Sequence, residues 1–538
     1  MINQKYGVVY TPHRLADFVA TLLQRVVGNQ SLNTVLDPAS GECSLLNAVK
    51  RKFGDTCEYI GIDVDQNAVD STKDNFTIIY NDAILPINAK KTSADYWREK
   101  LPVINAIIAN PPWSSEKIYE KSILEKAGYN LLSGQYDSYV LFIELAYNII
   151  CDNGVMAFII PDSLFDAQNE RLRKFLLEKT QIKIIARLGE KIFDDVNRAT
   201  TIIICKKSLP SPDNETICFR LSTDARKEYL AEKDTLISFF DKSKHSVMQS
   251  RFMRNACYNF DIDVHSEEEE LLAKISSETI EWKHIFSFGR GVEISKTGKI
   301  VYCPTCNYAQ GYKRKQMDAG KKVCTYCGEI IPVNSETTHN VIMLLPNAES
   351  TRIFVGENIH RYKINGEYYI RTNIHGINYK KLDLYNSPKL LVRKTGLGIY
   401  GAIDYSGSMT SQTVYVLRYV AKNNTTPLEY YLALLNSRVV YYYYLKVYGE
   451  NEWKSHPYLT KKIIYSLPIR PYIADELDQQ IIRLSEVLMQ EYNYQTDLQL
   501  EQLIMQKYGL TNKERNMISE ELNCLPNLSA VKNMKMEA

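Results

Sequence analysis

Three acids and one amide follow four successive apolar runs in the first third of the chain: Asp37, Asp63, Asp82 and Asn110. Each of them alone would be an ordinary helix cap or turn residue. Asp63, however, lies about 20 residues after Gly41, the spacing at which an acid binds the ribose hydroxyls in nucleoside-binding sheets. The loop "DPASGECS" has one glycine, and no Gly-Lys-Ser/Thr sequence is present, so a phosphate-binding loop is not indicated. The pattern predicts binding of a nucleoside without a phosphate chain.

A second candidate site is the sequence Asn-Pro-Pro-Trp at residues 110–113, directly after the apolar run 104–109. Proline donates no hydrogen bond to a sheet and has a fixed φ, so two prolines give a rigid exit from a strand. An amide and a large aromatic ring at such a position would reduce the stability of the fold unless both side chains have a function. The sequence therefore predicts that Asn110 and Trp113 contact a ligand.

Alternating strands and helices bring these residues together. Helical patterns at 68–75, 138–150 and 168–179 lie between apolar runs that are typical of strands; the strand-bearing segments are 33–40, 58–65, 76–83, 104–113, 154–163 and 199–207. This alternation predicts an α/β fold with a mostly parallel sheet that is covered on both faces. Ligands of such sheets bind beyond the carboxyl ends of the strands, where all four polar residues stand.

The order of five short segments resembles the amino-methylating DNA methyltransferases. The segments are "YTP" at 10–12, "LDPASGECSLL" at 36–46, "GIDVD" at 61–65, "NDA" at 81–83 and "NPPW" at 110–113. The closest group has the S-adenosylmethionine motifs first and a C-terminal target-recognition domain. The resemblance covers nearly all of the chain. It implies a Rossmann-like methyltransferase sheet followed by an α+β target-recognition domain.

The resemblance implies a set of residues that bind S-adenosylmethionine: Thr11, Pro12, Asp37, Ala39, Gly41, Asp63, Val64, Asp82 and Asn110. Thr11 and Pro12 would line the methionine end, with Asp37 near the methionine amino group. Ala39 and Gly41 would form the loop beneath it.

The same resemblance assigns the nucleoside end of the cofactor to three residues. Asp63 would accept the ribose hydroxyls, Val64 would pack on the adenine ring, and Asp82 would accept the adenine amino group. The sequence departs from the usual glycine pair in the first loop, since Cys43 stands where a second glycine is common. This difference puts the backbone geometry of that loop in question.

The Asn-Pro-Pro-Trp sequence then has a chemical explanation. An exocyclic amino group of a base is a poor nucleophile, because its lone pair is delocalised into the ring. The Asn110 side-chain oxygen and the Pro111 carbonyl can bond both amino hydrogens and favour the tetrahedral geometry that frees the lone pair. Pro111 and Pro112 would hold these acceptors rigidly. The resemblance implies that Trp113 stacks on the flipped target base and that Phe193 closes its other side; plain packing is the alternative for both rings.

Asparagine at the head of this sequence resembles the N6-adenine pattern more than the N4-cytosine pattern, so we expect adenine N6 in duplex DNA as the substrate. N4-cytosine methylation and methylation of RNA or protein glutamine are alternatives. A fused nuclease and a non-catalytic DNA-binding protein are also considered. The fused nuclease is not favoured, because the methyltransferase motifs begin by residue 10. The non-catalytic protein is not favoured, because Asn110, Asp63 and Asp82 are intact.

The second half of the chain loses the strand–helix alternation. We place the expected domain boundaries so that residues 1–240 form the methyltransferase domain, 241–470 the target-recognition domain and 471–538 a C-terminal helical segment. Arg393 and Lys394, in a segment of strand character, are candidate DNA contacts. An amphipathic helix is expected from about Asp475.

Four of the 11 cysteines have the spacing C-x2-C-x17-C-x2-C: Cys303, Cys306, Cys324 and Cys327. This spacing predicts a zinc ribbon at about residues 300–330, with Zn2+ held by four thiolates. Four protein ligands leave no open coordination position, so the zinc would be structural. Reduced structural cysteines are the alternative.

Residues 296–329, which contain the four cysteines and are called the cysteine segment below, are also basic. Their cations are Lys296, Lys299, Lys313, Arg314, Lys315, Lys321 and Lys322, against Asp318 and Glu329. Such a run is either a solvated face or a surface that contacts DNA phosphates.

Composition sets the remaining expectations. The net charge of the 538 residues is +2, so any surface for nucleic acid must be local. The start of the chain lacks the pattern of a secretory signal, and no apolar run is long enough to span a membrane, so we expect a cytoplasmic protein with no membrane partner. Double-stranded DNA is the expected partner, and a cognate restriction endonuclease or other defence-system proteins are candidate protein partners.

Overall fold

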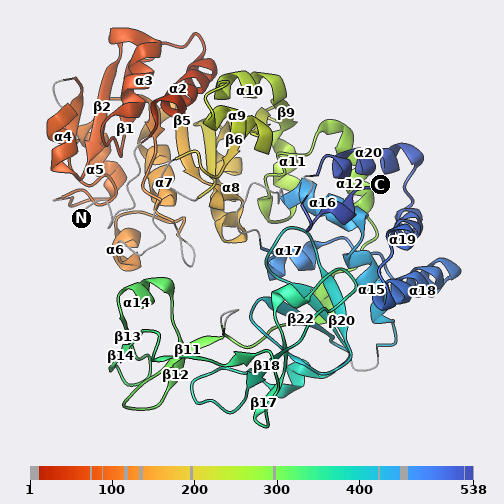
Figure 1. Cartoon of the computed structure of the whole chain (residues 1–538). Coiled ribbons are helices and arrows are strands. Elements are labelled where there is room, and N and C mark those ends of the chain that lie inside the picture. The colour runs from red at the N-terminus through yellow and green to blue at the C-terminus, as the bar shows by residue number, and fades with distance from the viewer. Residues whose placement is uncertain are drawn as a thin grey trace. The chain divides into compact units, whose positions relative to one another are not determined.

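The computed structural model describes residues 11–72, 75–87, 89–113, 119–132, 137–193, 198–294, 298–421, 424–448, 458–525 and 528–536. The chain divides into two compact units (Figure 1). Unit 1 comprises Met1–Glu268 and Lys446–Ser455, and unit 2 comprises Glu269–Leu445 and His456–Ala538. Tyr10 and Lys296, which the sequence analysis singled out, lie outside the described residues.

Unit 1 is built on a nine-stranded sheet with the order β3-β2-β1-β4-β5-β7-β6-β8-β9. The strands are β1 (Thr34–Asp37), β2 (Glu58–Asp63), β3 (Thr77–Tyr80), β4 (Ile104–Ala109), β5 (Ile150–Pro161), β6 (Gln181–Gly189), β7 (Thr200–Lys206), β8 (Glu215–Arg220) and β9 (His245–Met248). The first five strands are parallel to one another, and β7 is antiparallel to both of its neighbours. The expected mostly parallel α/β sheet is therefore confirmed.

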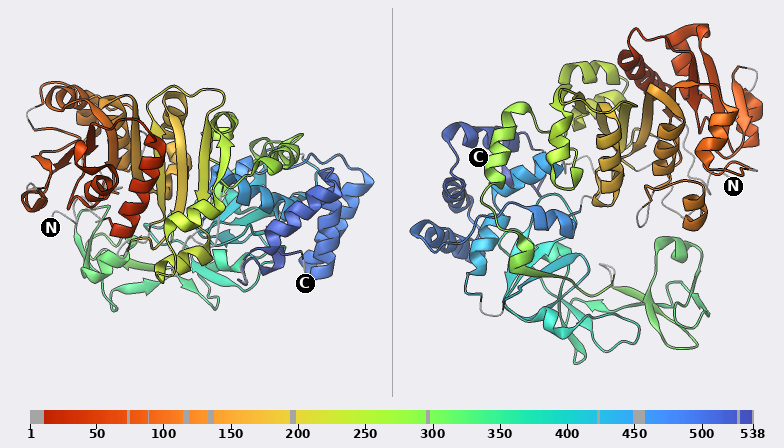
Figure 2. Two further views of the ribbon diagram at one scale, coloured as in Figure 1. Left: turned by 90° about the horizontal axis from the view of Figure 1, so that it is seen from above. Right: turned by 180° about the vertical axis from the view of Figure 1, so that it is seen from behind.

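Helices cover both faces of this sheet, as Figures 1 and 2 show. In β4, Ala106 and Ile108 belong to a core that includes side chains of α2 (His13–Val27) and α3 (Ser44–Phe53). Ile107 and Ala109 belong to a second core on the other face, because successive side chains of a strand point to opposite faces. The helices of that face are α5 (Ser93–Lys100), α7 (Tyr139–Ile149) and α8 (Glu170–Lys179).

Three strands were not predicted: β6, β8 and β9. The apolar run of β6 follows α8 with only Thr180 between them, so no turn residue separates the two elements in the sequence. Beyond the expected boundary near residue 240, β9 pairs with β8 and so completes the sheet. Phe252 and Ile262 then join the core of unit 1, and the unit continues to Glu268.

Unit 2 contains several small sheets. One has the order β10-β22-β19-β20 and another β16-β18-β17-β21; a three-stranded sheet, β12-β11-β15, and the hairpin β13-β14 carry the cysteine segment. The bounds are β10 (Phe286–Arg290), β11 (Lys299–Tyr302), β12 (Ala309–Gly311), β13 (Lys321–Val323), β14 (Ile330–Pro332), β15 (Thr338–Asn340), β16 (Ile342–Met343), β17 (Ser350–Phe354), β18 (Tyr368–Arg371), β19 (Lys389–Arg393), β20 (Gly401–Asp404), β21 (Met409–Thr410) and β22 (Val414–Tyr419). Short α14 (Arg314–Asp318) leads into β13.

The C-terminal helices α18 (Glu476–Gln490), α19 (Tyr494–Lys507) and α20 (Asn512–Asn523) belong to unit 2. Arg361 donates to both carboxylate oxygens of Asp497 on α19, at 2.8 and 2.9 Å, and Arg438 lies 3.0 Å from the same carboxylate. All three side chains are buried. Removing one partner of such a group costs about 3–5 kcal/mol, so the segment after residue 470 is tied firmly into unit 2. No helix in the described part of the chain has the length and apolar character needed to cross a membrane.

Candidate functional site

A cleft in unit 1 opens at the carboxyl ends of the parallel strands. The predicted site residues that line it are Thr11, Asp37, Ala39, Gly41, Asp63, Val64, Asp82, Asn110 and Pro112. Pro12 precedes α2, and its carbonyl accepts hydrogen bonds from the first turn of that helix. Pro111, Trp113 and Phe193 do not line the cleft, and all three are buried. The structure thus brings together most of the predicted residues, which come from five separate segments.

Asp63 holds in place the loop that follows β1, residues 37–44. Its carboxylate accepts hydrogen bonds from the backbone N–H of Gly41, at 2.7 Å, and of Asp65, at 2.8 Å. Asp37 accepts from the N–H of Ala39 at 3.0 Å. The carboxyl end of β2 therefore fixes the loop that follows β1.

Both of these acids have raised pKa values. Burial raises the pKa of Asp37 to about 8, and the negative charge of Asp63 adds to the rise. Burial also raises the pKa of Asp63. Two carboxyl groups that share a partly enclosed site favour a positively charged ligand, because such a ligand stabilises their ionised forms.

The backbone of the first loop explains the unusual cysteine. Gly41 has a φ of 47° and Cys43 a φ of 60°, both in the left-handed region. Glycine adopts this conformation freely, whereas another residue pays roughly 1–2 kcal/mol. Cys43 is completely buried and packs in the core beside α3. The sequence therefore departs from glycine at a position whose backbone still has the conformation that glycine prefers.

Asp82 is engaged by the protein itself. Its Oδ1 accepts from the N–H groups of Ile84 and Leu85, at 2.8 and 3.0 Å, and its Oδ2 accepts from the hydroxyl of Tyr119 at 2.6 Å. An ionised carboxylate has about four acceptor positions, so one position remains for a ligand. Tyr119 also lines the cleft, and no sequence pattern pointed to it.

Polar contacts with other segments hold the Asn-Pro-Pro-Trp loop in place. The Asn110 amide donates to Thr11 Oγ1 at 3.1 Å. Ser138 Oγ donates to the carbonyl of Pro112, and Arg198 donates to the carbonyl of Trp113 at 2.9 Å. No sequence pattern pointed to Ser138 or Arg198, since neither has a distinctive spacing.

Arg198 also donates to the buried carboxylate of Asp137 at 2.8 Å, and Ser163 donates to the same oxygen at 2.8 Å. A hydrogen bond between ionised groups is roughly twice as strong as a neutral one. This network links the loop after β4 to the segment before α7 and to the start of β7.

Trp113 and Phe193 contact each other edge to face, with ring centroids 5.3 Å apart and planes at 85°. They are only 8% and 2% exposed, and Trp113 Nε1 donates to the carbonyl of Ile159 at 3.3 Å. The segments that follow them, 114–118 and 194–197, lie outside the described residues. The two rings that were expected on opposite sides of a base therefore pack against one another in this structure.

A family model described as N-6 DNA Methylase matches residues 2–283, just over half of the chain. The chain belongs to this family. A second model, for a TaqI-like C-terminal specificity domain, matches residues 351–469 of this N-6 DNA methylase, which belong to unit 2 apart from residues 446–455.

Two curated relatives are type II methyltransferases. M.AccI of Acinetobacter calcoaceticus is 29% identical over 213 residues, which are 38% of this chain and 37% of the relative. The other, from Thermus thermophilus, is 26% identical over 200 residues, which are 35% of this chain and 42% of the relative. The N-6 DNA methylase described here thus spans less than half of the length of either relative.

Two solved structures have similar folds. One is the ATP-dependent Type ISP restriction-modification enzyme LlaBIII bound to DNA, with a TM-score of 0.52 and 14% identity, covering 91% of this chain and 39% of that chain. The other is the Type IIL restriction-modification enzyme MmeI in complex with DNA, with a TM-score of 0.52 and 11% identity, covering 94% and 74%. At these identities the likeness concerns the fold alone.

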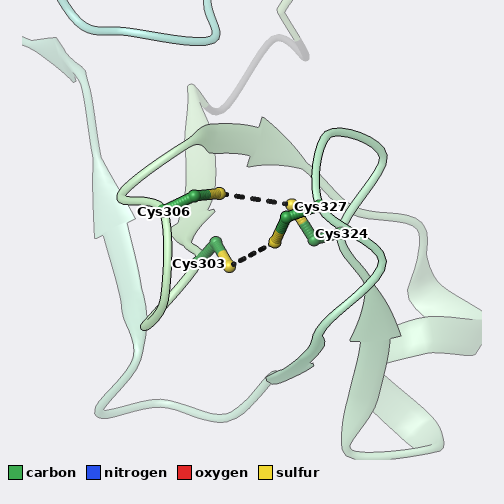
Figure 3. Close-up of side chains that lie close together, drawn as sticks. All are labelled: Cys303, Cys306, Cys324 and Cys327. Atoms are coloured by element: carbon green, nitrogen blue, oxygen red, sulfur yellow. Dashed lines mark hydrogen bonds between the residues drawn. The ribbon is translucent and has the colours of Figure 1, made fainter.

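In unit 2 of this N-6 DNA methylase, the four predicted cysteines gather at one point (Figure 3). Their sulfur atoms all lie within 4.8 Å of one another; Cys303 and Cys327 are 3.5 Å apart and Cys306 and Cys324 3.8 Å. Four thiolates at about 2.3 Å from a tetrahedral zinc would have sulfur atoms about 3.8 Å apart. The cluster therefore has the size of a four-thiolate zinc site.

Two equivalent turns build this cluster. In each, the N–H of the residue after the second cysteine donates to the carbonyl of the first: Asn307 to Cys303 at 2.9 Å, and Gly328 to Cys324 at 3.0 Å. Both donors have positive φ, 54° and 81°, a conformation that asparagine and glycine adopt readily. The sequence signal for each turn was the C-x2-C spacing, and the structure adds the Asn or Gly that follows it.

Arg393, the last residue of β19, and Lys394, the residue after it, are the candidate DNA contacts, and both are half-buried. The Arg393 guanidinium donates to the carbonyl of Thr395 at 2.6 Å.

Proposed function

We propose that this N-6 DNA methylase transfers the methyl group of S-adenosylmethionine to N6 of adenine in duplex DNA. The observation that carries the proposal is that Asp37, Asp63, Asp82 and Asn110 line one cleft of unit 1. The carboxyl edge of a parallel sheet is where such folds bind ligands. This cleft combines acceptors for a nucleoside with acceptors for an amino group, which is the pairing that N-methylation of a base requires.

The chemistry of the cleft fits S-adenosylmethionine. Asp37 would hold the methionine ammonium group, Asp63 the ribose hydroxyls and Asp82 the adenine amino group, while Val64 would pack on the adenine. When bound, the cofactor supplies a methyl group on a positively charged sulfur.

Asn110 and Pro111 would activate the target amino group. The Asn110 oxygen and the Pro111 carbonyl accept its two hydrogens, which directs the nitrogen lone pair toward the methyl group. Thr11 holds the amide of Asn110, and Ser138 holds the Pro112 carbonyl, so the acceptors need little rearrangement in the transition state. These contacts support a role in catalysis rather than in substrate affinity alone.

Trp113 and Phe193 would enclose the target base after it leaves the duplex. Because their rings are in mutual contact, one of them must move to admit a base between them. Stacking on aromatic side chains contributes about 1–3 kcal/mol per base, which offsets part of the cost of base flipping. We infer that the edge-to-face pair is the state before the base enters.

DNA is favoured over RNA or protein as the substrate by the match of residues 351–469 to a specificity domain. The test is incubation of the purified chain with S-adenosylmethionine and mixed duplex DNA, digestion to nucleosides and mass spectrometry. We expect N6-methyladenine. N4-methylcytosine would overturn the choice of base, and methylated RNA or protein without methylated DNA would overturn the choice of substrate. Methylation-sensitive long-read sequencing of the product then gives the recognition sequence.

We also propose that the cysteine cluster holds one structural Zn2+. Its four sulfur atoms have the separations that a tetrahedral thiolate site needs, and four protein ligands leave no position for a reacting water. The buried residues of the small core around it are Val301, Ile331 and Val333 together with Cys303 and Cys324. A core of this size stabilises little by itself, so metal binding would supply folding energy.

A further inference from the structure

The cysteine segment carries a group of cations that the methyl-transfer site does not use. Lys313, Arg314, Lys315 and Lys321 are all exposed. In the described part of the chain none of them forms an ion pair, although many other cations of unit 2 do, such as Lys380 with Glu293 and Lys507 with Asp478. Between residues 311 and 323 the only acid is Asp318.

A compact turn holds these cations close together. Lys313 caps α14, which carries Arg314 and Lys315. The N–H of Gly320, whose φ is 66°, donates to the carbonyl of Met317 at 3.0 Å, and β13 begins with Lys321 directly afterwards. The carbonyl of Gly320 accepts from Val333 N–H at 2.9 Å, so the residue that follows β14 holds this turn.

The turn is also anchored to the rest of unit 2. The N–H of Ala309 donates to the carbonyl of His375 at 2.8 Å, and the His375 ring lies edge-on to the rings of Tyr308 and Tyr326, at 5.1 and 5.8 Å. A Cβ atom at Gly376 would lie 2.2 Å from the carbonyl oxygen of Ala309. Only glycine permits this close approach, so the cysteine segment has a fixed place on the unit that contains most of the specificity-domain match.

We propose that Lys313, Arg314, Lys315 and Lys321 form a phosphate-contacting surface for duplex DNA. It would add affinity without reading sequence. This inference rests on the proposed function insofar as it names DNA as the partner. Unpaired cations on a rigid, locally basic turn attract a polyanion, and each phosphate that they neutralise releases condensed counterions. A merely solvated surface would not need an anchored backbone, and in a chain with a net charge of +2 no general excess of positive charge explains the group.

Lys322 differs from these four residues. Its ammonium group donates to the carbonyl of Gly311 at 2.7 Å and so joins β13 to β12. Burial lowers its pKa. It is therefore kept unchanged in the test below, because its loss would disturb the turn itself.

The test compares the wild-type chain with the variant Lys313→Gln/Arg314→Gln/Lys315→Gln/Lys321→Gln. The matched control replaces four exposed cations elsewhere in unit 2, Lys381, Arg483, Lys513 and Lys532, by glutamine, which gives the same change of charge. Affinity for a duplex with the mapped recognition sequence and for an unrelated duplex is measured over a range of salt concentrations. Metal content and S-adenosylmethionine binding report that each variant is folded.

We expect the first variant to lose affinity for both duplexes by the same factor, at least about tenfold at low salt. The slope of log K against log salt should become shallower by about 3 to 4, since each phosphate contact contributes about 0.9. The preference for the recognition sequence should be unchanged. An unchanged slope in a folded, metal-loaded variant would overturn the proposal that these residues contact phosphates. An equal loss of DNA affinity in the control variant would overturn it as well. Absence of DNA binding by the wild-type chain would overturn both this surface and the proposed function, whereas binding without methyl transfer would overturn only the latter.

Discussion

The side-chain amide of Asn110 donates a hydrogen bond to the hydroxyl of Thr11, with 3.1 Å between Nδ2 and Oγ1, although the two residues are 99 positions apart in the chain. The nitrogen and the oxygen of an amide lie on opposite sides of one planar group. A partner for the nitrogen therefore fixes the direction of the oxygen. Thr11 thus orients the acceptor on which the proposed reaction depends.

Asn110→Ala should lower the turnover number by about 100-fold or more, by analogy with the loss of one preorganised hydrogen bond, about 2.7–4 kcal/mol. Cofactor affinity should stay close to that of the wild type. Asp63→Ala should do the reverse and weaken cofactor binding first, because it also releases the N–H of Gly41. Single-turnover kinetics and calorimetric titration measure the two effects. Exchanged phenotypes would show that the roles assigned to these residues are wrong.

Removal of either ring of the aromatic pair should impair base flipping. Phe193→Ala and Trp113→Ala should each reduce the fluorescence rise of 2-aminopurine at the target position and lower turnover, while cofactor binding is kept. Phe193→Tyr keeps an aromatic face and serves as the matched control. If Phe193→Ala gave the full fluorescence rise, Phe193 would be a packing residue only.

Arg198→Ala should lower turnover by about 10- to 100-fold, since a hydrogen bond from a charged group contributes about 1.5–3 kcal/mol. The loss arises because Arg198 no longer holds the Trp113 carbonyl and leaves the buried Asp137 carboxylate without its ion pair. Arg198→Lys retains the charge and should recover part of the activity. A reduced melting temperature with normal turnover in the remaining folded protein would instead indicate a purely structural role.

Cofactor binding should depend on pH through Asp37. With a pKa of about 8, this carboxyl group is protonated at neutral pH in the unliganded protein, and a bound ammonium group favours its ionised form. Binding therefore releases a proton, and affinity should rise by up to about tenfold per pH unit between about pH 6 and 8 and then level off. Calorimetry in two buffers of different ionisation enthalpy measures the released proton. Asp37→Asn should bind more weakly and without this pH dependence, and a wild-type affinity that is flat with pH would contradict the assignment.

Cys324→Ser/Cys327→Ser should lose one zinc per chain, weaken DNA binding and leave S-adenosylmethionine binding near normal, because the proposed cofactor cleft belongs to unit 1 and the cysteines to unit 2. Elemental analysis, DNA binding and cofactor titration on this variant test all three points. Cys524→Ser, which changes an exposed cysteine outside the cluster, is the control. A wild-type chain without metal would remove the zinc proposal.

Local sequence was sufficient for the features that depend on neighbouring residues. Apolar runs ending in Asp37, Asp63 and Asn110 predicted strands whose polar ends meet at one edge, because parallel strands place their carboxyl ends together. The two C-x2-C turns were likewise visible, since each turn is closed within a few residues. In both cases the order of residue types along the chain determines the geometry.

Tertiary structure alone decided the features that depend on distant contacts. The extension of unit 1 to Glu268 follows from the pairing of β9 with β8. No sequence pattern near residue 240 indicates this extension. The bonds of Thr11 to Asn110 and of Arg198 to the Trp113 carbonyl join segments 99 and 85 residues apart. Burial of Asp37, which raises its pKa, is likewise a property of the packed fold. Sequence patterns report which face of an element is apolar, but which elements then pack together is decided by the free energy of the whole fold, so such contacts leave no local signal.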